Sequence, residues 1–166
     1  YTAVSYGVPD AADPRLHGIR GVSFESGNVI KVTTQLTRHK TDRQKQYVVF
    51  SGGRHAVTRM KVVEKFGTPA QVARVECWLE TGRTHQIRVH MAHIGHGLLG
   101  DPTYGGRRKL NTRAFTESGL SCANKFVRQA LHASVLGFKH PRTSEYQRFE
   151  ADLPLDMRKL LQSLAN

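Results

Sequence analysis

The residues best suited to chemistry lie between Glu80 and His90, where a β-type pattern changes into a helical one. Five polar side chains gather there: Arg83, His85, Gln86, Arg88 and His90. The unpaired N–H groups and positive dipole end at the start of a helix favour bound anions. Arg88 lies one turn after His85, beside the apolar face, so we expect it to be partly buried and paired with a carboxylate or phosphate. The alternative for Arg88 is a surface position on an amphipathic helix.

A metal site is the second chemistry that this region suggests. Four histidines follow closely on one another, and these are His85, His90, His93 and His96. Their spacing places them only loosely on one helix face, and no nearby cysteine or carboxylate completes a usual ligand set. We therefore expect no metal, and interpret these histidines as solvated or phosphate-facing.

The elements that must position these residues are a strand and the helix after it. Val72–Glu80 alternates apolar and polar residues, which is typical of a half-buried strand. Ala56–Phe66 alternates as well, and the turn residues Gly67–Pro69 between the two runs predict an antiparallel hairpin. From His85 onward the apolar residues recur at helical spacing. The pattern predicts Thr84 as N-cap and Gly95 as the residue that ends the helix.

The remaining runs predict further strands and one more helix. The predicted strands are Tyr1–Val8, Asn28–Leu36, Gln46–Phe50, Gln129–Phe138 and Glu145–Leu153, and a final helix is expected from Pro154. No linker or repeat divides the 166 residues. Strands joined by hairpins predict an α+β fold with a mainly antiparallel mixed sheet and a few short flanking helices.

Charge narrows the class of partner. The chain carries 25 Lys and Arg against 13 Asp and Glu, a net charge of +12. The excess is concentrated in Lys31–Lys65 and Arg83–Arg113, which favours nucleic acid over a merely basic surface. No apolar run approaches the roughly 18 residues of a membrane span, and the first residues do not resemble a signal peptide. Two isolated cysteines predict reduced thiols and a cytoplasmic protein.

Three segments together resemble the RluA-type RNA pseudouridine synthase family. The longest is Glu80–Gly106. Arg38–Arg43 with Gly53–Thr58, and Arg128–Ala133, match the family in the same order. The resemblance implies the pseudouridine synthase fold and the isomerisation of uridine in structured RNA, most often ribosomal RNA, without cofactor or metal. It also implies that residues 1–166 form the C-terminal part of one catalytic domain, with the catalytic aspartate motif before Tyr1.

The same resemblance implies roles for nine residues. Tyr1 and Arg88 match the family's active-site tyrosine and the arginine that pairs with its catalytic aspartate. Contacts to RNA are implied or expected for Arg38, His39, Arg43, Arg83, His85, Gln86 and Leu131, although a plain core position is the alternative for Leu131. Because that aspartate is absent from these 166 residues, Arg88 is expected to lack a partner and the chain alone to be inactive. Asp101 is interpreted as structural, and nothing is inferred for Arg15–Val32.

Two other classes of protein remain open. A non-catalytic, basic RNA-binding module would need only the charge, although the signatures of the common RNA-binding modules do not occur in the chain. A structural basic protein of the ribosomal kind would usually have basic tails, and none is visible. A monomer that binds RNA and no membrane is the expectation.

Overall fold

The computed structural model describes residues 1–106 and 108–166, so the basic segment Arg83–Arg113 is described except at residue 107. The elements follow one another as β1 (Thr2–Tyr6), α1 (Pro14–His17), β2 (Val22–Glu25), β3 (Val29–Arg38), β4 (Gln46–Val49), β5 (Arg54–Phe66), β6 (Val72–Leu79), α2 (Gln86–His93), α3 (Glu117–Asn124), β7 (Leu131–His132), β8 (Val135–Lys139), β9 (Tyr146–Glu150) and α4 (Leu155–Ala165).

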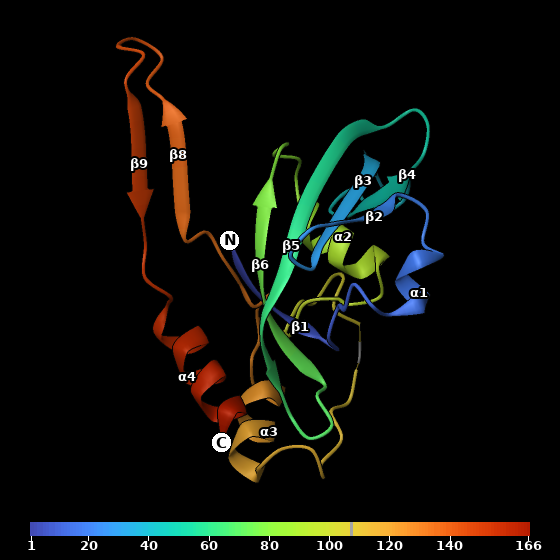
Figure 1. Ribbon diagram of the computed structural model, residues 1–166, viewed down its shortest axis with the longest axis vertical. Coiled ribbons are helices and arrows are strands. Elements are labelled where there is room, and N and C mark those ends of the chain that lie inside the picture. The colour runs from blue at the N-terminus through green and yellow to red at the C-terminus, as the bar shows by residue number, and fades with distance from the viewer. Residues whose placement is uncertain (107) are drawn as a thin grey trace.

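Seven strands form one sheet in the order β2-β3-β5-β6-β1-β7, with β4 added to β3. Every pairing in it is antiparallel. The long strand β5 runs through the middle (Figure 1) and pairs with β6 through the hairpin predicted at Gly67–Pro69. The α+β class with a mainly antiparallel sheet is therefore confirmed.

The sheet is covered on both faces, and side chains alternate between the two faces along β1, which lies between β6 and the edge strand β7. Ala3 packs into a core with Ile87 and Met91 of α2. Its neighbour Val4 faces the other way, into a second core with Met157 of α4. In Figure 1, α1 and α2 lie to the right of β6. Helices α3 and α4 lie near the lower end of the sheet. The residues around the β6–α2 junction belong to the first core, which includes Cys77 and Ile87 and has Leu79 packed against it.

Several elements depart from the predicted pattern. The short α1 and β2, and the small-residue helix α3, carry too little periodicity to be recognised. The strand predicted for Gln129–Phe138 is broken into β7, which joins the large sheet, and β8, which pairs only with β9. The β8–β9 hairpin consequently stands apart from the large sheet (Figure 1).

Both cysteines are free thiols, as predicted, and burial raises the pKa of Cys77 to about 12. In the described part of the chain, no helix combines the length and the hydropathy required to cross a bilayer.

Candidate active site

The β6–α2 junction is tied together by the buried amide of Gln86. Its Nε2 donates to the carbonyl oxygen of Val57 (2.9 Å) and to Thr58 Oγ1 (3.0 Å) on β5. Its Oε1 accepts from the Arg83 backbone N–H (3.0 Å) and from Thr81 Oγ1 (2.8 Å). Both ends of the amide are engaged inside the protein, so Gln86 shapes the loop, and its contact to RNA stays a prediction.

The cap of α2 differs from the predicted one. His85, not Thr84, is the N-cap residue, and no side chain caps this helix end. His85 has φ of 58°, a left-handed conformation that a non-glycine residue adopts only where its surroundings hold it. The conformation turns the imidazole toward Tyr104, whose hydroxyl lies 3.0 Å from His85 Nδ1. At the other end of the helix, Gly95 has the positive φ that the sequence predicted.

Arg88 is buried and paired, as its place beside the apolar face predicted, but its partner was not foreseen. Its Nε and Nη2 donate to the two carboxylate oxygens of Asp101 at 2.8 and 2.7 Å. Asp101 also accepts the backbone N–H groups of Thr103 and Tyr104. The expectation that Arg88 lacks a partner in this chain is therefore wrong. The structural interpretation of Asp101 is sharpened, because its carboxylate fixes the guanidinium.

The electrostatics of this pair follow from its geometry. Burial alone would raise the pKa of Asp101, but the Arg88 hydrogen bonds and two backbone N–H groups outweigh burial, so the pKa is lowered. Arg88 Nη1 has no hydrogen-bond partner among the described residues, and it is not among their fully buried, unsatisfied atoms. One edge of the guanidinium thus stays available for another carboxylate.

Tyr104 connects Arg88 to the rest of the site. Its ring lies under the guanidinium, 4.9 Å from the Arg88 carbon Cζ. Its hydroxyl accepts the Gln46 N–H (2.7 Å) and therefore has its own hydrogen to donate to His85 Nδ1. Burial, followed by the charge of Arg88, lowers the pKa of His85. A neutral imidazole that accepts at Nδ1 carries its proton on Nε2.

Six of the nine predicted site residues line one cavity of about 270 Å³. They are Tyr1, Arg83, His85, Gln86, Arg88 and Leu131, joined by Leu79, Ile87 and Gln129. Tyr1 continues the β-ladder, since its nitrogen donates to the Cys77 carbonyl and its carbonyl accepts from the Cys77 N–H, both at 2.9 Å. Three segments far apart in sequence thus meet at one pocket, and Arg88 is among the residues that line it.

The other three predicted residues lie elsewhere. Arg38 lines a neighbouring cavity, together with Arg83. His39 organises the β3–β4 loop, where its Nδ1 accepts the Asp42 N–H (3.2 Å). Arg43 is exposed in the same loop. His39 and Arg43 are absent from the lining of both cavities.

Sequence reasoning missed two residues of this site. Asp101 had been assigned only a structural role, and Tyr104 was not singled out, yet together they hold Arg88 from below. Both belong to the Glu80–Gly106 segment, which was the available signal. A buried arginine demands a carboxylate, and Asp101 is the only acid between Arg83 and Arg113.

Among the four clustered histidines, His90 has a structural role in the core. Its side chain is fully buried, with Nε2 2.8 Å from Thr34 Oγ1 and Nδ1 2.8 Å from Thr58 Oγ1. Instead, His93 Nε2 lies 3.0 Å from the Arg20 carbonyl oxygen, and His96 Nδ1 lies 3.1 Å from the Tyr6 carbonyl oxygen. Among the residues that the structure describes, no group of three or more His, Cys, Asp or Glu could hold a metal ion.

We expect His90 to make the fold less stable in mild acid. Burial, with the nearby His93 charge, lowers the pKa of His90 from 6.5 to about 4. Below pH 6.5 the unfolded chain therefore binds a proton that the folded chain refuses, and stability falls until pH 4. From pH 7 to pH 5 the loss is about 2 kcal/mol, that is, 6.5 minus 5 multiplied by about 1.36.

Urea unfolding at the two pH values measures this loss, and His90→Gln is the comparison. The variant should be less stable at pH 7 but lose about 2 kcal/mol less than the wild type on going to pH 5. His85 and His96, whose pKa values are also lowered, remain in both proteins and cancel in the difference. An equal loss in both proteins would show that His90 is not the sensitive group.

The chain is similar in sequence to known proteins. A family model described as RNA pseudouridylate synthase matches residues 22–93. The uncharacterized RNA pseudouridine synthase YlyB of Bacillus subtilis is 45% identical over 90% of this chain and 42% of its own length. The ribosomal large subunit pseudouridine synthase D of Zymomonas mobilis is 44% identical over 80% of this chain and 39% of its own length.

Solved structures agree at the level of the fold. Human RNA Pseudouridylate Synthase Domain Containing 1 superposes with a TM-score of 0.62 at 21% identity, over 92% of this chain and 53% of that chain. Human RNA Pseudouridylate Synthase Domain Containing 4 gives a TM-score of 0.60 at 20% identity, over 98% and 60%. The chain spans about two fifths of the length of the curated relatives it matches.

Proposed function

Because the chain belongs to the RNA pseudouridylate synthase family, we propose that the full-length protein isomerises uridine to pseudouridine in structured RNA, with ribosomal RNA as its substrate. The N1–C1′ bond of the nucleoside breaks, the uracil turns while it is held, and C1′ joins C5. C5 then loses its hydrogen as a proton and N1 gains a proton, so atoms and electrons balance. Because the isomerisation is redox-neutral, the proposal includes no redox cofactor, and it includes no metal. We also propose that the protein is a monomer and that it acts in the cytoplasm.

The observation that carries the proposal is that predicted site residues from three separate segments line the same 270 Å³ cavity. Tyr1, Arg88 and Leu131 come from the first residue, from α2 and from β7, and all three line it. A ring and an aliphatic side chain supply apolar walls for a base that has left its stack. The guanidinium at the base of the pocket would orient a carboxylate next to the sugar.

The carboxylate itself is proposed to come from a part of the protein that precedes Tyr1. Asp101 is fully buried beneath Arg88 and its oxygens accept bonds from that arginine and two N–H groups. Because its oxygens are occupied in this way, Asp101 holds Arg88 in place and is not proposed as the catalytic carboxylate. The accessible Nη1 of Arg88 could ion-pair with a second carboxylate and keep it ionised. In this account Arg88 bridges a structural aspartate and the catalytic one.

Comparing ribosomal RNA from cells with and without the gene tests the substrate. Pseudouridine-specific chemical labelling should show at least one modified position that disappears with the gene and returns with the full-length protein. Identical labelling patterns in the two RNAs would remove ribosomal RNA from the proposal. A protein that binds RNA tightly but modifies none would favour the non-catalytic RNA-binding module.

The exposed arginine of the β3–β4 loop provides a prediction about affinity. Arg43→Ala should weaken binding to a structured RNA and reduce the slope of log affinity against log salt by about 1, because one phosphate contact is lost. Fluorescence titration over a range of salt concentrations measures both quantities. Arg158→Ala, which removes the same charge from α4, should change neither. Equal effects of the two substitutions would mean that net charge alone governs binding.

A further inference from the structure

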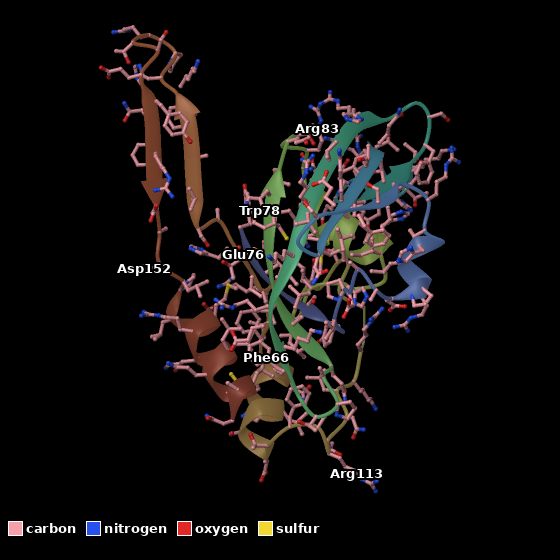
Figure 2. The ribbon with its side chains drawn as sticks, in the orientation of Figure 1. Phe66, Glu76, Trp78, Arg83, Arg113 and Asp152 are labelled. Carbon is pink, nitrogen blue, oxygen red and sulfur yellow. The ribbon has the colours of Figure 1, made fainter. Side chains whose placement is uncertain are left out.

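A second, larger cavity adjoins the proposed uridine pocket. It measures about 590 Å³ and lies between the end of β3, the start of β5 and the loop that leads into α2. Arg38, Arg54 and Arg83 contribute one arginine from each of these segments. In Figure 2, Arg83 stands at the upper end of the sheet, above Trp78 of β6.

The positive charge of this cavity is not neutralised by the described part of the protein. No acidic residue lines it, and its three arginines are missing from the ion pairs that the described residues form. Elsewhere on the same sheet, basic side chains are paired. Arg59 contacts both Glu25 and Glu80. Three unpaired guanidiniums around one cavity repel one another, and an anion between them would relieve that repulsion.

Two walls of the cavity are positioned by specific contacts of Gly53 and Arg83. Gly53, next to Arg54, donates its N–H to Gln35 Oε1 (2.8 Å). A Cβ at Gly53 would lie 2.6 Å from Val49 Cγ2, so this backbone packs too closely for any other residue. On the opposite wall, Arg83 Nε donates to the His55 carbonyl (3.0 Å), which leaves both Nη groups for a ligand. Arg83 is thus held at one edge before a ligand arrives and loses less entropy on binding than a free side chain would, whereas Arg38 and Arg54 are exposed at the other walls.

The position of the cavity identifies its ligand. Arg83 lines both the arginine cavity and the uridine pocket. A nucleotide whose base and sugar occupy the pocket must therefore carry its backbone past Arg83. Phosphate oxygens accept bidentate hydrogen bonds from guanidinium groups in the geometry that arginine offers. In protein–DNA complexes, hydrogen bonds to phosphates and sugars fix the register of the protein along the nucleic acid.

We propose that Arg38, Arg54 and Arg83 form a phosphate-binding site for the RNA backbone, and that it holds one linkage within a nucleotide of the target uridine. The proposal rests on the proposed function and adds the register of the RNA to it. Arg54 is the new member, because it lies in the segment Gly53–Thr58 that resembles the family but was given no role there. The site fixes which nucleotide reaches the pocket.

Replacing single phosphates tests this directly in the full-length protein. The probe is an RNA stem-loop with one uridine in its loop, in which each loop linkage is replaced in turn by an uncharged methylphosphonate. One substituted linkage near the uridine should weaken wild-type binding about tenfold, as expected for the loss of a charged hydrogen bond. Arg54→Gln should weaken binding of the unmodified RNA by a similar factor and be insensitive to that linkage.

Two further variants keep the result decisive. Arg38→Gln, on a different strand, should show the same coupling to the same linkage. Arg158→Gln, which removes an equal charge from α4, should retain the full wild-type sensitivity. The proposal is overturned if the losses from Arg54→Gln and from each methylphosphonate simply multiply at every linkage, or if Arg54→Gln behaves as Arg158→Gln does.

Pseudouridine formation is measured on the same RNA, so that the two proposals can fail separately. Coupling at one linkage without any pseudouridine would retain the phosphate site and contradict the proposed function. Normal pseudouridine formation without coupling would retain the function and overturn the phosphate site.

Discussion

Replacing Arg88 by glutamine in the full-length protein is expected to lower the turnover rate at saturating RNA about a hundred- to a thousandfold, the usual cost of losing one preorganised charged donor. RNA affinity should change little, because Arg88 is buried beneath the pocket and the exposed arginines remain. Single-turnover kinetics with labelled RNA separate the chemical step from binding.

The same substitution also removes the partner of a buried carboxylate, so a stability control is needed. Arg88→Gln alone leaves Asp101 charged and unpaired at a position where its side chain has no exposed surface. The double variant Arg88→Gln with Asp101→Asn removes both charges, and it should recover much of the lost stability. It should not recover turnover. A double variant with near wild-type turnover would show that Arg88 serves the fold alone.

Asp101→Asn is expected to lower the free energy of unfolding by about 3 kcal/mol or more, because Arg88 would then be a buried cation without its counterion. Asp156→Asn is the matched control. It breaks the Arg128–Asp156 pair, which has the same bidentate geometry but is well exposed. Such a surface pair contributes about 1 kcal/mol or less. Urea unfolding followed by circular dichroism measures both.

The pH dependence of this difference has a definite sign. The pKa of Asp101 is lowered in the folded protein, so its ionised form stabilises the fold at neutral pH. That stabilisation is lost as the pH falls from about 3.9, the ordinary value of an unfolded aspartate, through the lower folded value. The gap between wild type and Asp101→Asn should therefore narrow in acid. Similar losses for Asp101→Asn and Asp156→Asn at pH 7 would contradict the role given to burial.

The parts of the fold with strong periodicity could be predicted from sequence. Strand β6 alternates along most of its length because one side chain in two faces a core, and α2 has apolar residues at helical spacing. In β5 the alternation is interrupted by three successive buried residues, Ala56–Thr58, and by a register shift between Val62 and Glu64. The four-residue α1 is too short for any period to be visible. The break between β7 and β8 depends on which strand accepts each hydrogen bond, and this is decided by tertiary contacts rather than by local preference.

The candidate site was predictable to a similar degree. Residue types and the family resemblance nominated Tyr1, Arg88 and Leu131, which do meet at one cavity. Burial of Arg88 implied a carboxylate or phosphate partner, but the choice of Asp101 depends on a turn that brings residues 88 and 101 together. Arg54 was missed because its position beside Arg38 and Arg83 follows from the antiparallel register of β3 and β5, in which it pairs with Leu36.

The central claim, that this pocket isomerises uridine, is tested most directly by the purified full-length protein. It is incubated with structured ribosomal RNA in the presence of a metal chelator and without any added cofactor, and pseudouridine is counted per protein molecule by chemical labelling. We predict that each wild-type protein molecule forms several pseudouridines, all at the same position of the RNA. With Arg88→Gln we predict no pseudouridine above background. RNA that is bound but left unmodified by the wild-type protein, or modified equally by the variant, would contradict the account.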